Sequence, residues 1–218
     1  MQQYDVPFFS NTPDGTHCFQ ASMRSILKYF LPEREFEWTE LEQMSAKKSG
    51  LSTWPTQMLM NLNSMGFEVI LIEGFNVRDF IKKGSEYLNK EFGQEVASWQ
   101  IKNSDVPQEQ TLYSKLLKSD VKLLQNIPTQ EDIKKYLSEN YLLSCMLNSR
   151  RLNHKPGYVG HSITIIDQDS KGFIIHDPGL PPQKNRHVSF EDFEAAWADP
   201  NKQAKSLIAI KPKMKGSK

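Results

Sequence analysis

The order of the sequence patterns is the feature that most restricts the fold of this chain. Helical periodicity comes first, because apolar residues recur at the spacing of one helix face at Phe19, Met23, Ile26, Leu27 and Phe30. Pro32 then ends this helix. In the last third, short apolar runs alternate with turns at residues 159–167, 172–177 and 206–210. Helices followed by a mostly antiparallel sheet predict an α+β fold whose two lobes meet at a cleft.

Two further helices are expected soon after the first one. Thr39 and Glu42 form a capping-box pattern, which predicts that a helix begins at Thr39. A third helix is expected from near Thr53, with Pro55 in its first turn, to Gly66. The remaining predicted elements are strands at 67–72 and 141–148 and short helices that begin at Thr129 and Ser189.

The segment 77–126 has a mostly helical and rather polar pattern, which residues 102–107 interrupt. We expect this segment to be a helical insert or a mobile cap. A chain of 218 residues fits one large domain or two small ones, and we expect one domain over residues 1–218 that contains this insert.

Length and charge narrow the class of protein. With 38% apolar and 11% aromatic residues, a chain of 218 residues is typical of a globular protein with a substantial core. The 27 basic and 26 acidic residues nearly cancel, so we expect neither nucleic acid nor a membrane as a partner. The longest aliphatic run, residues 69–72, is too short to cross a bilayer, and the first residues lack a secretory pattern. We therefore expect a cytoplasmic protein of undetermined oligomeric state.

Cys18 is the first of three residues that together carry a possible chemistry. It lies at the start of the first helix, where free backbone N–H groups and the helix dipole favour a thiolate if Thr16 is the cap. Its position is off the apolar stripe of that helix. The alternative interpretation is a small buried apolar side chain, which is the commonest fate of a free cysteine.

His161 and Asp177 complete this set from the other end of the chain. His161 begins an apolar strand and Asp177 ends the next one, although a strand cap and an Asp-Pro-Gly turn would explain them equally simply. An odd-length turn between the strands would put both side chains on one face, and an even-length turn would separate them. A thiol, an imidazole and a carboxylate are the parts of a cysteine acyl-transfer site.

Asn11 offers a side-chain amide that, with the Cys18 N–H, is suited to stabilise an oxyanion. Its alternative interpretation is an ordinary turn asparagine. Cys145 lies in an apolar strand and is expected to be a buried structural thiol, so the two cysteines are expected to remain free.

Metal and nucleotide chemistry find no support in the sequence. It contains no Cys-x-x-Cys or His-x-x-x-His pair and no glycine-rich phosphate loop. We therefore expect no metal and no cofactor.

Four segments together resemble a known family: residues 6–11 (VPFFSN), 18–22 (CFQAS), 160–165 (GHSITI) and 175–178 (IHDP). Their order is similar to that in the bacteriocin-processing, or double-glycine leader, peptidases, which are papain-like cysteine peptidases. The resemblance implies a papain-like fold, in which a helix carrying the cysteine packs on a sheet carrying the histidine and aspartate. A stand-alone soluble relative is the closer comparison, because the transporter-fused members are membrane proteins.

The resemblance also implies roles for individual residues. Cys18 would be the nucleophile, His161 the general base and acid, and Asp177 the group that orients the imidazole. Asn11 takes the position of the family's oxyanion glutamine. The implied activity is hydrolysis of a peptide-like bond through a thioester, without a cofactor. Two alternatives remain, namely an amidase or acyl transferase and a catalytically silent member that binds peptide.

Two departures from the family pattern bear on these roles. Asn11 is one methylene shorter than glutamine, so its amide reaches an oxyanion only if the loop closes in. Phe19 and Gln20 replace the usual Gly-Pro after the cysteine, and we expect them to fill space near the cleft.

Overall fold

The computed structural model describes residues 5–213, in which seven strands form one sheet in the order β2-β1-β7-β3-β4-β5-β6. Its strands are β1 (Phe67–Glu73), β2 (Lys122–Leu124), β3 (Leu142–Asn148), β4 (Gly160–Gln168), β5 (Gly172–Asp177), β6 (Gln183–Ser189) and β7 (Ser206–Pro212). β2 pairs parallel with β1, and every other pair is antiparallel. The predicted α+β class with a mostly antiparallel sheet is confirmed.

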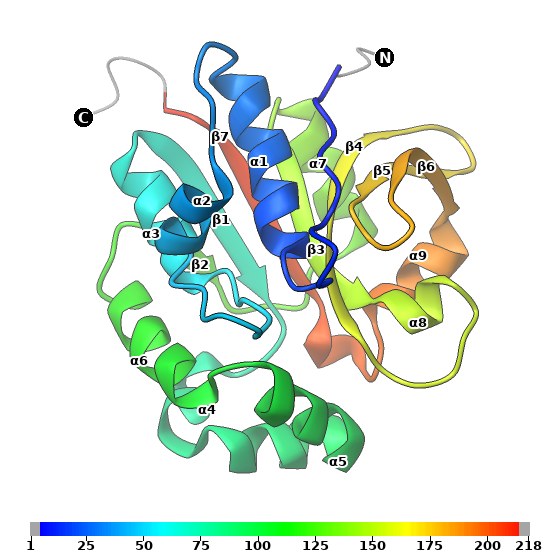
Figure 1. Cartoon of the computed structure of the whole chain (residues 1–218). Helices are drawn as coiled ribbons and strands as arrows, with labels where there is room; N and C mark the ends of the chain where they lie inside the picture. Colours follow the sequence, from blue (N-terminus) through cyan, green and yellow to red (C-terminus); the bar gives the residue numbers. More distant parts are fainter. Residues whose placement is uncertain (1–4, 214–218) are drawn as a thin grey trace.

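Helices cover both faces of this sheet. They are α1 (Cys18–Phe30), α2 (Trp38–Met44), α3 (Thr56–Ser64), α4 (Val77–Lys83), α5 (Ser85–Asn103), α6 (Val106–Leu116), α7 (Gln130–Ser138), α8 (Ser149–Leu152) and α9 (Phe190–Trp197). Figure 1 shows α1 across one face, with α2 and α3 beside it and α4–α6 beyond the lower end of the sheet. α7 and α9 pack on β3 from the other face. No helix of the described part of the chain could span a membrane.

The central strands are apolar on both sides because each face of the sheet is covered. In β1, Val69 and Leu71 belong to the core beneath α1, whereas Ile70 and Ile72 belong to the core beneath α7 and α9. The same alternation continues in β7 and β4. The first of these cores packs α1 against β4, the strand that carries His161.

Helix starts were predicted with mixed success. The prediction of a capping box at Thr39 and Glu42 is wrong. α2 begins at Trp38, and its N-cap, Glu37, makes no side-chain hydrogen bond to the helix. At Thr129, by contrast, the reciprocal capping bonds with Asp132 are present. The third helix begins after Pro55, slightly later than expected. β6 was missed, because it is an exposed edge strand with almost no apolar residue.

The segment 77–126 contains three helices and one short strand. A break at Ser104 separates α5 from α6, within the predicted interruption. β2 extends the sheet at its edge, which the helical pattern did not indicate. At Gly93, φ is +82°, so α5 bends at a residue that adopts this conformation easily.

Candidate active site

Cys18 is the first residue of α1, and its side chain is partly exposed. The predicted Thr16 cap is wrong: His17 is the N-cap, and the Thr16 hydroxyl donates to Asp14 Oδ2 at 2.8 Å instead. The thiol nevertheless lies in the first turn, where backbone N–H groups have no helical partner. The N–H groups of Phe19 and Ser162 stabilise its charged form.

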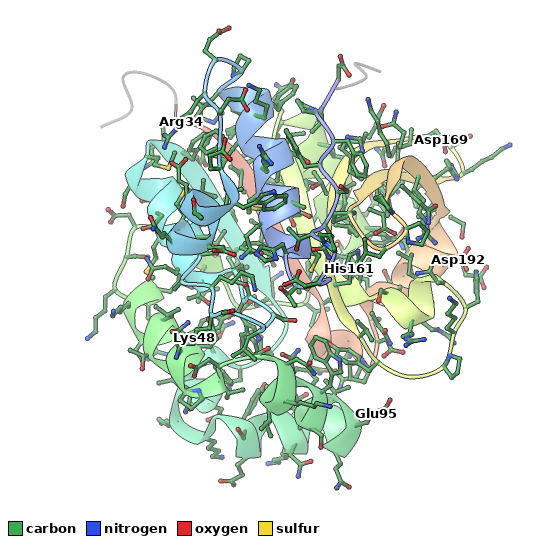
Figure 2. The ribbon with its side chains drawn as sticks, in the orientation of Figure 1. Arg34, Lys48, Glu95, His161, Asp169 and Asp192 are labelled. Carbon is green, nitrogen blue, oxygen red and sulfur yellow. The ribbon has the colours of Figure 1, made fainter. Side chains whose placement is uncertain are left out.

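The Cys18 thiol and the His161 imidazole lie close enough for each to shift the ionisation of the other. Figure 2 shows His161 at the centre of the molecule, near the beginning of α1. Burial opposes ionisation of Cys18, but its interaction with His161 and the charge of the imidazolium lower the pKa of the thiol. Burial likewise opposes the charge on His161, but its interactions with Asp177 and Cys18 raise the pKa of the imidazole. The pair is therefore suited to exist as thiolate and imidazolium.

Asp177 holds the imidazole from its other side. Its Oδ1 lies 2.7 Å from His161 Nε2, which leaves Nδ1 as the ring nitrogen available to Cys18. Burial alone would raise the pKa of Asp177, but the contacts with His161, the Gly179 N–H and Arg186 lower it to about 2. The carboxylate is therefore charged at neutral pH and fixes the orientation of the ring.

A β-bulge puts His161 and Asp177 on the same face of the sheet. On the turn side, Asp167 pairs with Ile174, and an unbroken ladder in this register would separate the two side chains. The bulge between Ile165 and Asp167 shifts the pairing by one residue. The even-length turn therefore does not separate them, because the bulge restores the common face.

Arg186 is a member of the site that the sequence did not reveal. It lies on β6, donates to Asp177 Oδ2 at 2.8 Å and to the Leu152 carbonyl at 3.1 Å, and is largely buried. Asp177 thus receives hydrogen bonds on both carboxylate oxygens. No local motif marks this arginine, because its strand was itself unrecognised.

Asn11 lies beside the reacting groups and in a defined orientation. Its Oδ1 accepts the N–H groups of His17 at 2.8 Å and Thr12 at 2.9 Å, so this atom must be the oxygen. The backbone N–H of Asn11 donates to the Pro178 carbonyl at 2.8 Å, and this bond holds the loop next to Asp177. The Asn11 Nδ2 has no hydrogen-bond partner among residues 5–213 and remains available as a donor.

A cavity of about 240 Å³ adjoins these groups. Asn11, His161 and Asp177 line it together with residues of the loop 179–183. Gly179 packs so closely over the His161–Asp177 bond that a Cβ there would lie 2.9 Å from Asp177 Oδ1. The loop therefore shields this hydrogen bond while the cavity leaves space for part of a substrate.

Lys47 is a second group that sequence reasoning missed. Its ammonium donates to Thr16 Oγ1 at 3.1 Å and to the Leu51 carbonyl at 2.6 Å. Burial lowers the pKa of Lys47, whereas the nearby negative charges of Asp14, Glu42 and Cys18 favour its charged form. A positive charge thus lies within electrostatic reach of the thiolate.

Phe19 and Gln20 do not fill the cleft as expected. Both are fully buried, and the Gln20 amide donates to Ser45 Oγ at 2.8 Å and Thr53 Oγ1 at 2.9 Å. They face the core between α1 and the loop after α2. That expectation was wrong because the direction of each side chain depends on where α1 begins.

Cys145 behaves as predicted for a structural thiol. It is fully buried in β3 and free, and burial raises the pKa of its thiol well above the ordinary value. Cys18 is free as well. The contrast between the two environments is the one expected between a reactive cysteine and an inert one.

α5 contributes a wall beside His161. The Trp99 ring packs against Tyr158 with centroids 5.5 Å apart, and a Cβ at Gly160 would lie 3.2 Å from this indole. At the end of α5, the Asn103 carbonyl accepts the Ser52 N–H at 2.6 Å. One helix of the segment 77–126 therefore contacts both β4 and the loop that follows α2.

Comparison with known proteins identifies the architecture. No protein-family model matches the sequence, and no curated protein matches it significantly. The peptidase domain of Streptococcus ComA, a bifunctional ABC transporter of a quorum-sensing pathway, superimposes with a TM-score of 0.53 at 12% identity. The match covers 95% of this chain and 99% of that domain. The chain has the fold of the bacteriocin-processing peptidases.

A protein from Bacillus anthracis described as C39-like peptidase also matches. It covers 97% of each chain at 14% identity, with a TM-score of 0.47. Because the identity to the ComA domain is only 12%, the comparison shows a shared backbone fold and nothing about individual side chains. The chemistry of this bacteriocin-processing peptidase fold must be argued from its own side chains.

The Arg186–Asp177 contact predicts a stability difference. Replacing Arg186 with Met should lower the free energy of unfolding by about 2–3 kcal/mol at pH 7, because it leaves a buried carboxylate with one partner fewer. Urea unfolding would measure this change. Lys184→Met on the same strand is the control, since Lys184 is exposed. Equal midpoints for the two variants would show that the ion pair contributes nothing.

Proposed function

We propose that this protein is a cysteine peptidase that hydrolyses a peptide-like bond through a thioester intermediate. The observation that carries the proposal is the arrangement of three side chains: His161 Nε2 lies 2.7 Å from Asp177 Oδ1, and the Cys18 thiol and the His161 imidazole shift each other's pKa. A partly exposed thiol with a lowered pKa at a helix start is a nucleophile rather than a packing residue. The bacteriocin-processing peptidase fold supports the same reaction class.

In the first half of the reaction, the Cys18 thiolate attacks the substrate carbonyl and forms a C–S bond. The His161 imidazolium then gives its proton to the departing amine as the C–N bond breaks. In the second half, His161 takes a proton from water, whose oxygen attacks the thioester. The C–S bond breaks, the acid product leaves, and the thiolate and imidazolium are restored.

The negative oxygen that forms in each half is stabilised by donors at the start of α1. The Cys18 N–H is one of them, and the unpartnered Asn11 Nδ2 is the second. Asn is shorter than the family's glutamine, but the bond between Asn11 and Pro178 ties the loop against the site. Asn11 therefore acts as the oxyanion donor in this proposal.

Substitution of Asn11 by Asp separates this role from a structural one. Asp keeps an oxygen to accept the N–H groups of His17 and Thr12 but presents a second acceptor where Nδ2 was. We expect kcat to fall by about 10²–10³-fold with little change in KM. Steady-state kinetics and urea unfolding would be measured together. An unchanged kcat would remove Asn11 from the catalytic machinery.

The central experiment combines labelling with cleavage. We expect iodoacetamide at pH 6 to modify Cys18, leave Cys145 unmodified and abolish cleavage of a peptide library. Mass spectrometry of tryptic fragments locates the adduct. A faster reaction at Cys145, or full cleavage by protein alkylated at Cys18, would overturn the proposal. Analysis of the products with and without an added amine distinguishes hydrolysis from acyl transfer.

The substrate class and the compartment follow from the same chemistry. The cavity beside His161 and Asp177 is open to a peptide-like chain, so a peptide is the proposed substrate. A reducing compartment such as the cytoplasm suits the enzyme, because a low-pKa thiolate is readily oxidised.

A further inference from the structure

A second cavity lies between the helices of the segment 77–126 and the end of the sheet. Its volume is about 100 Å³, on a measure by which one water needs roughly 10–15 Å³, so it has room for a chain of several atoms. Aromatic side chains form much of its wall, namely Trp54, Phe75, Phe92, Tyr113 and Tyr158. Glu73, the last residue of β1, also lines it.

Glu73 is buried with one oxygen unused. Only 3% of the residue is exposed, and its Oε1 accepts the Tyr113 hydroxyl at 2.7 Å. Its Oε2 is buried and has no hydrogen-bond partner within residues 5–213. A buried carboxyl oxygen without a partner is unfavourable by itself, so this atom points to a ligand with a hydrogen-bonding group.

A second buried acid lies close to the first. Glu109 is also 3% exposed and accepts the Thr56 hydroxyl at 3.0 Å. Neither acid has an ion pair with a lysine or arginine in the described part of the chain. Burial raises the pKa of Glu73 to about 8, and the charge of Glu109 contributes to this shift. The region therefore holds acidic groups that no protein cation neutralises.

We propose that this cavity binds an organic ammonium ion on an apolar stem, with the ammonium on Glu73 Oε2 and the stem against the aromatic wall. An ammonium donates a hydrogen bond to Glu73 Oε2, and its charge compensates the carboxylate that forms when Glu73 loses its proton on binding. Aromatic faces attract cations and also pack well against methylene groups. A neutral apolar molecule would leave Glu73 Oε2 without a partner.

Two sources carry this chemistry, a free alkylamine and the lysine side chain of a peptide. The cavity wall at Tyr158 is three residues before His161, and Trp99 contacts Tyr158 and packs over Gly160. A peptide bound near His161 is thus one possible carrier of the ammonium. The cavity itself does not depend on Cys18 chemistry, so its occupancy is testable without any peptidase activity.

The direct test is calorimetric titration of the full chain with n-butylamine at pH 7.5, with 1-butanol as the neutral match. We expect a Kd on the order of 1 mM for the amine, in keeping with so few heavy atoms. The Glu73→Gln variant should bind the amine at least about tenfold more weakly, because a charge-assisted hydrogen bond is lost. Glu95→Gln is the matched control, since Glu95 is exposed on α5 (Figure 2).

Proton release gives a second readout. Ammonium binding favours the ionised form of Glu73, so we expect proton release that disappears in Glu73→Gln. Titration in two buffers of different ionisation enthalpy measures it. The titratable groups that face Glu73 are Tyr87, Tyr113 and Glu109, and all three are retained in the variant.

Three results would overturn the proposal. The first is no binding of n-butylamine at a concentration 50-fold above the expected Kd of about 1 mM. The others are equally tight binding of 1-butanol, and equally tight amine binding by the folded Glu73→Gln protein. Urea unfolding establishes that the variant is folded. A pair of peptides that differ only in lysine or norleucine distinguishes the sources. Competition between the lysine peptide and n-butylamine assigns the cavity to a peptide side chain, and amine binding without competition assigns it to a free amine.

Discussion

Replacing Cys18 with Ala should remove peptide hydrolysis, with a fall in kcat of about 10⁴-fold or more. The reason is that the thiolate is the atom that forms the covalent intermediate, and no other group beside His161 can replace it. A fluorogenic peptide chosen from the library gives the rate. The folded state should be retained, because Cys18 is partly exposed and its methyl-sized replacement leaves the apolar stripe of α1 intact.

Cys145→Ala is the internal control for this result. It removes the other thiol from a fully buried position in β3, so it should lower stability by about 1 kcal/mol but leave kcat within about twofold. Cleavage that survives in Cys18→Ala and disappears in Cys145→Ala would contradict the assignment of the nucleophile. If both variants kept full cleavage, the activity would depend on neither cysteine.

The His161→Gln substitution should have the second largest effect, and it acts on the ionisation of Cys18. Without the imidazolium, burial dominates and the pKa of the thiol returns to at least its ordinary value. Alkylation of Cys18 by iodoacetamide at pH 6 should then slow by about tenfold, which allows for the higher intrinsic nucleophilicity of a more basic thiolate. Rates measured from pH 5 to 9 give the full profile.

The direction of the pH dependence follows from the lowered pKa of Cys18 and the raised pKa of His161. In the wild-type protein the reactive pair exists above the lowered pKa of Cys18 and below the raised pKa of His161. Reactivity should therefore persist in mildly acidic solution and decline only below the thiol pKa. His187→Gln serves as the control, since His187 lies exposed on β6. Identical profiles for both variants would exclude an ion pair between Cys18 and His161.

The sequence indicated the proposed catalytic residues but not how they are oriented. Cys18, His161 and Asp177 lie at an element start or end, where residue type and pattern can be read locally. Whether His161 and Asp177 share a face depends on a one-residue bulge between Ile165 and Asp167. The sequence at this point contains no residue pattern that predicts a bulge. Register is set by pairing across strands, which a single sequence does not contain.

The supporting residues were missed for a related reason. Arg186 belongs to an exposed strand without apolar alternation, and its partner Asp177 is nine residues away. Lys47 resembles any surface lysine until the loop after α2 folds back on Thr16. Glu73 ends an apolar strand, where a charged residue normally marks the return to solvent, yet α5 and α6 bury it. Such side chains acquire their environment only from tertiary packing.

The amino-terminal arm is bonded to the strand that ends in Asp177 at two points, through Val6 and Asn11. The His176 ring lies 2.9 Å from the Val6 carbonyl, and the Asn11 N–H meets the Pro178 carbonyl. Removal of the arm past Asn11 would therefore take away the proposed oxyanion donor without removing Cys18, His161 or Asp177. In the proposed peptidase, cleavage at this end of the polypeptide would therefore cause an irreversible loss of activity.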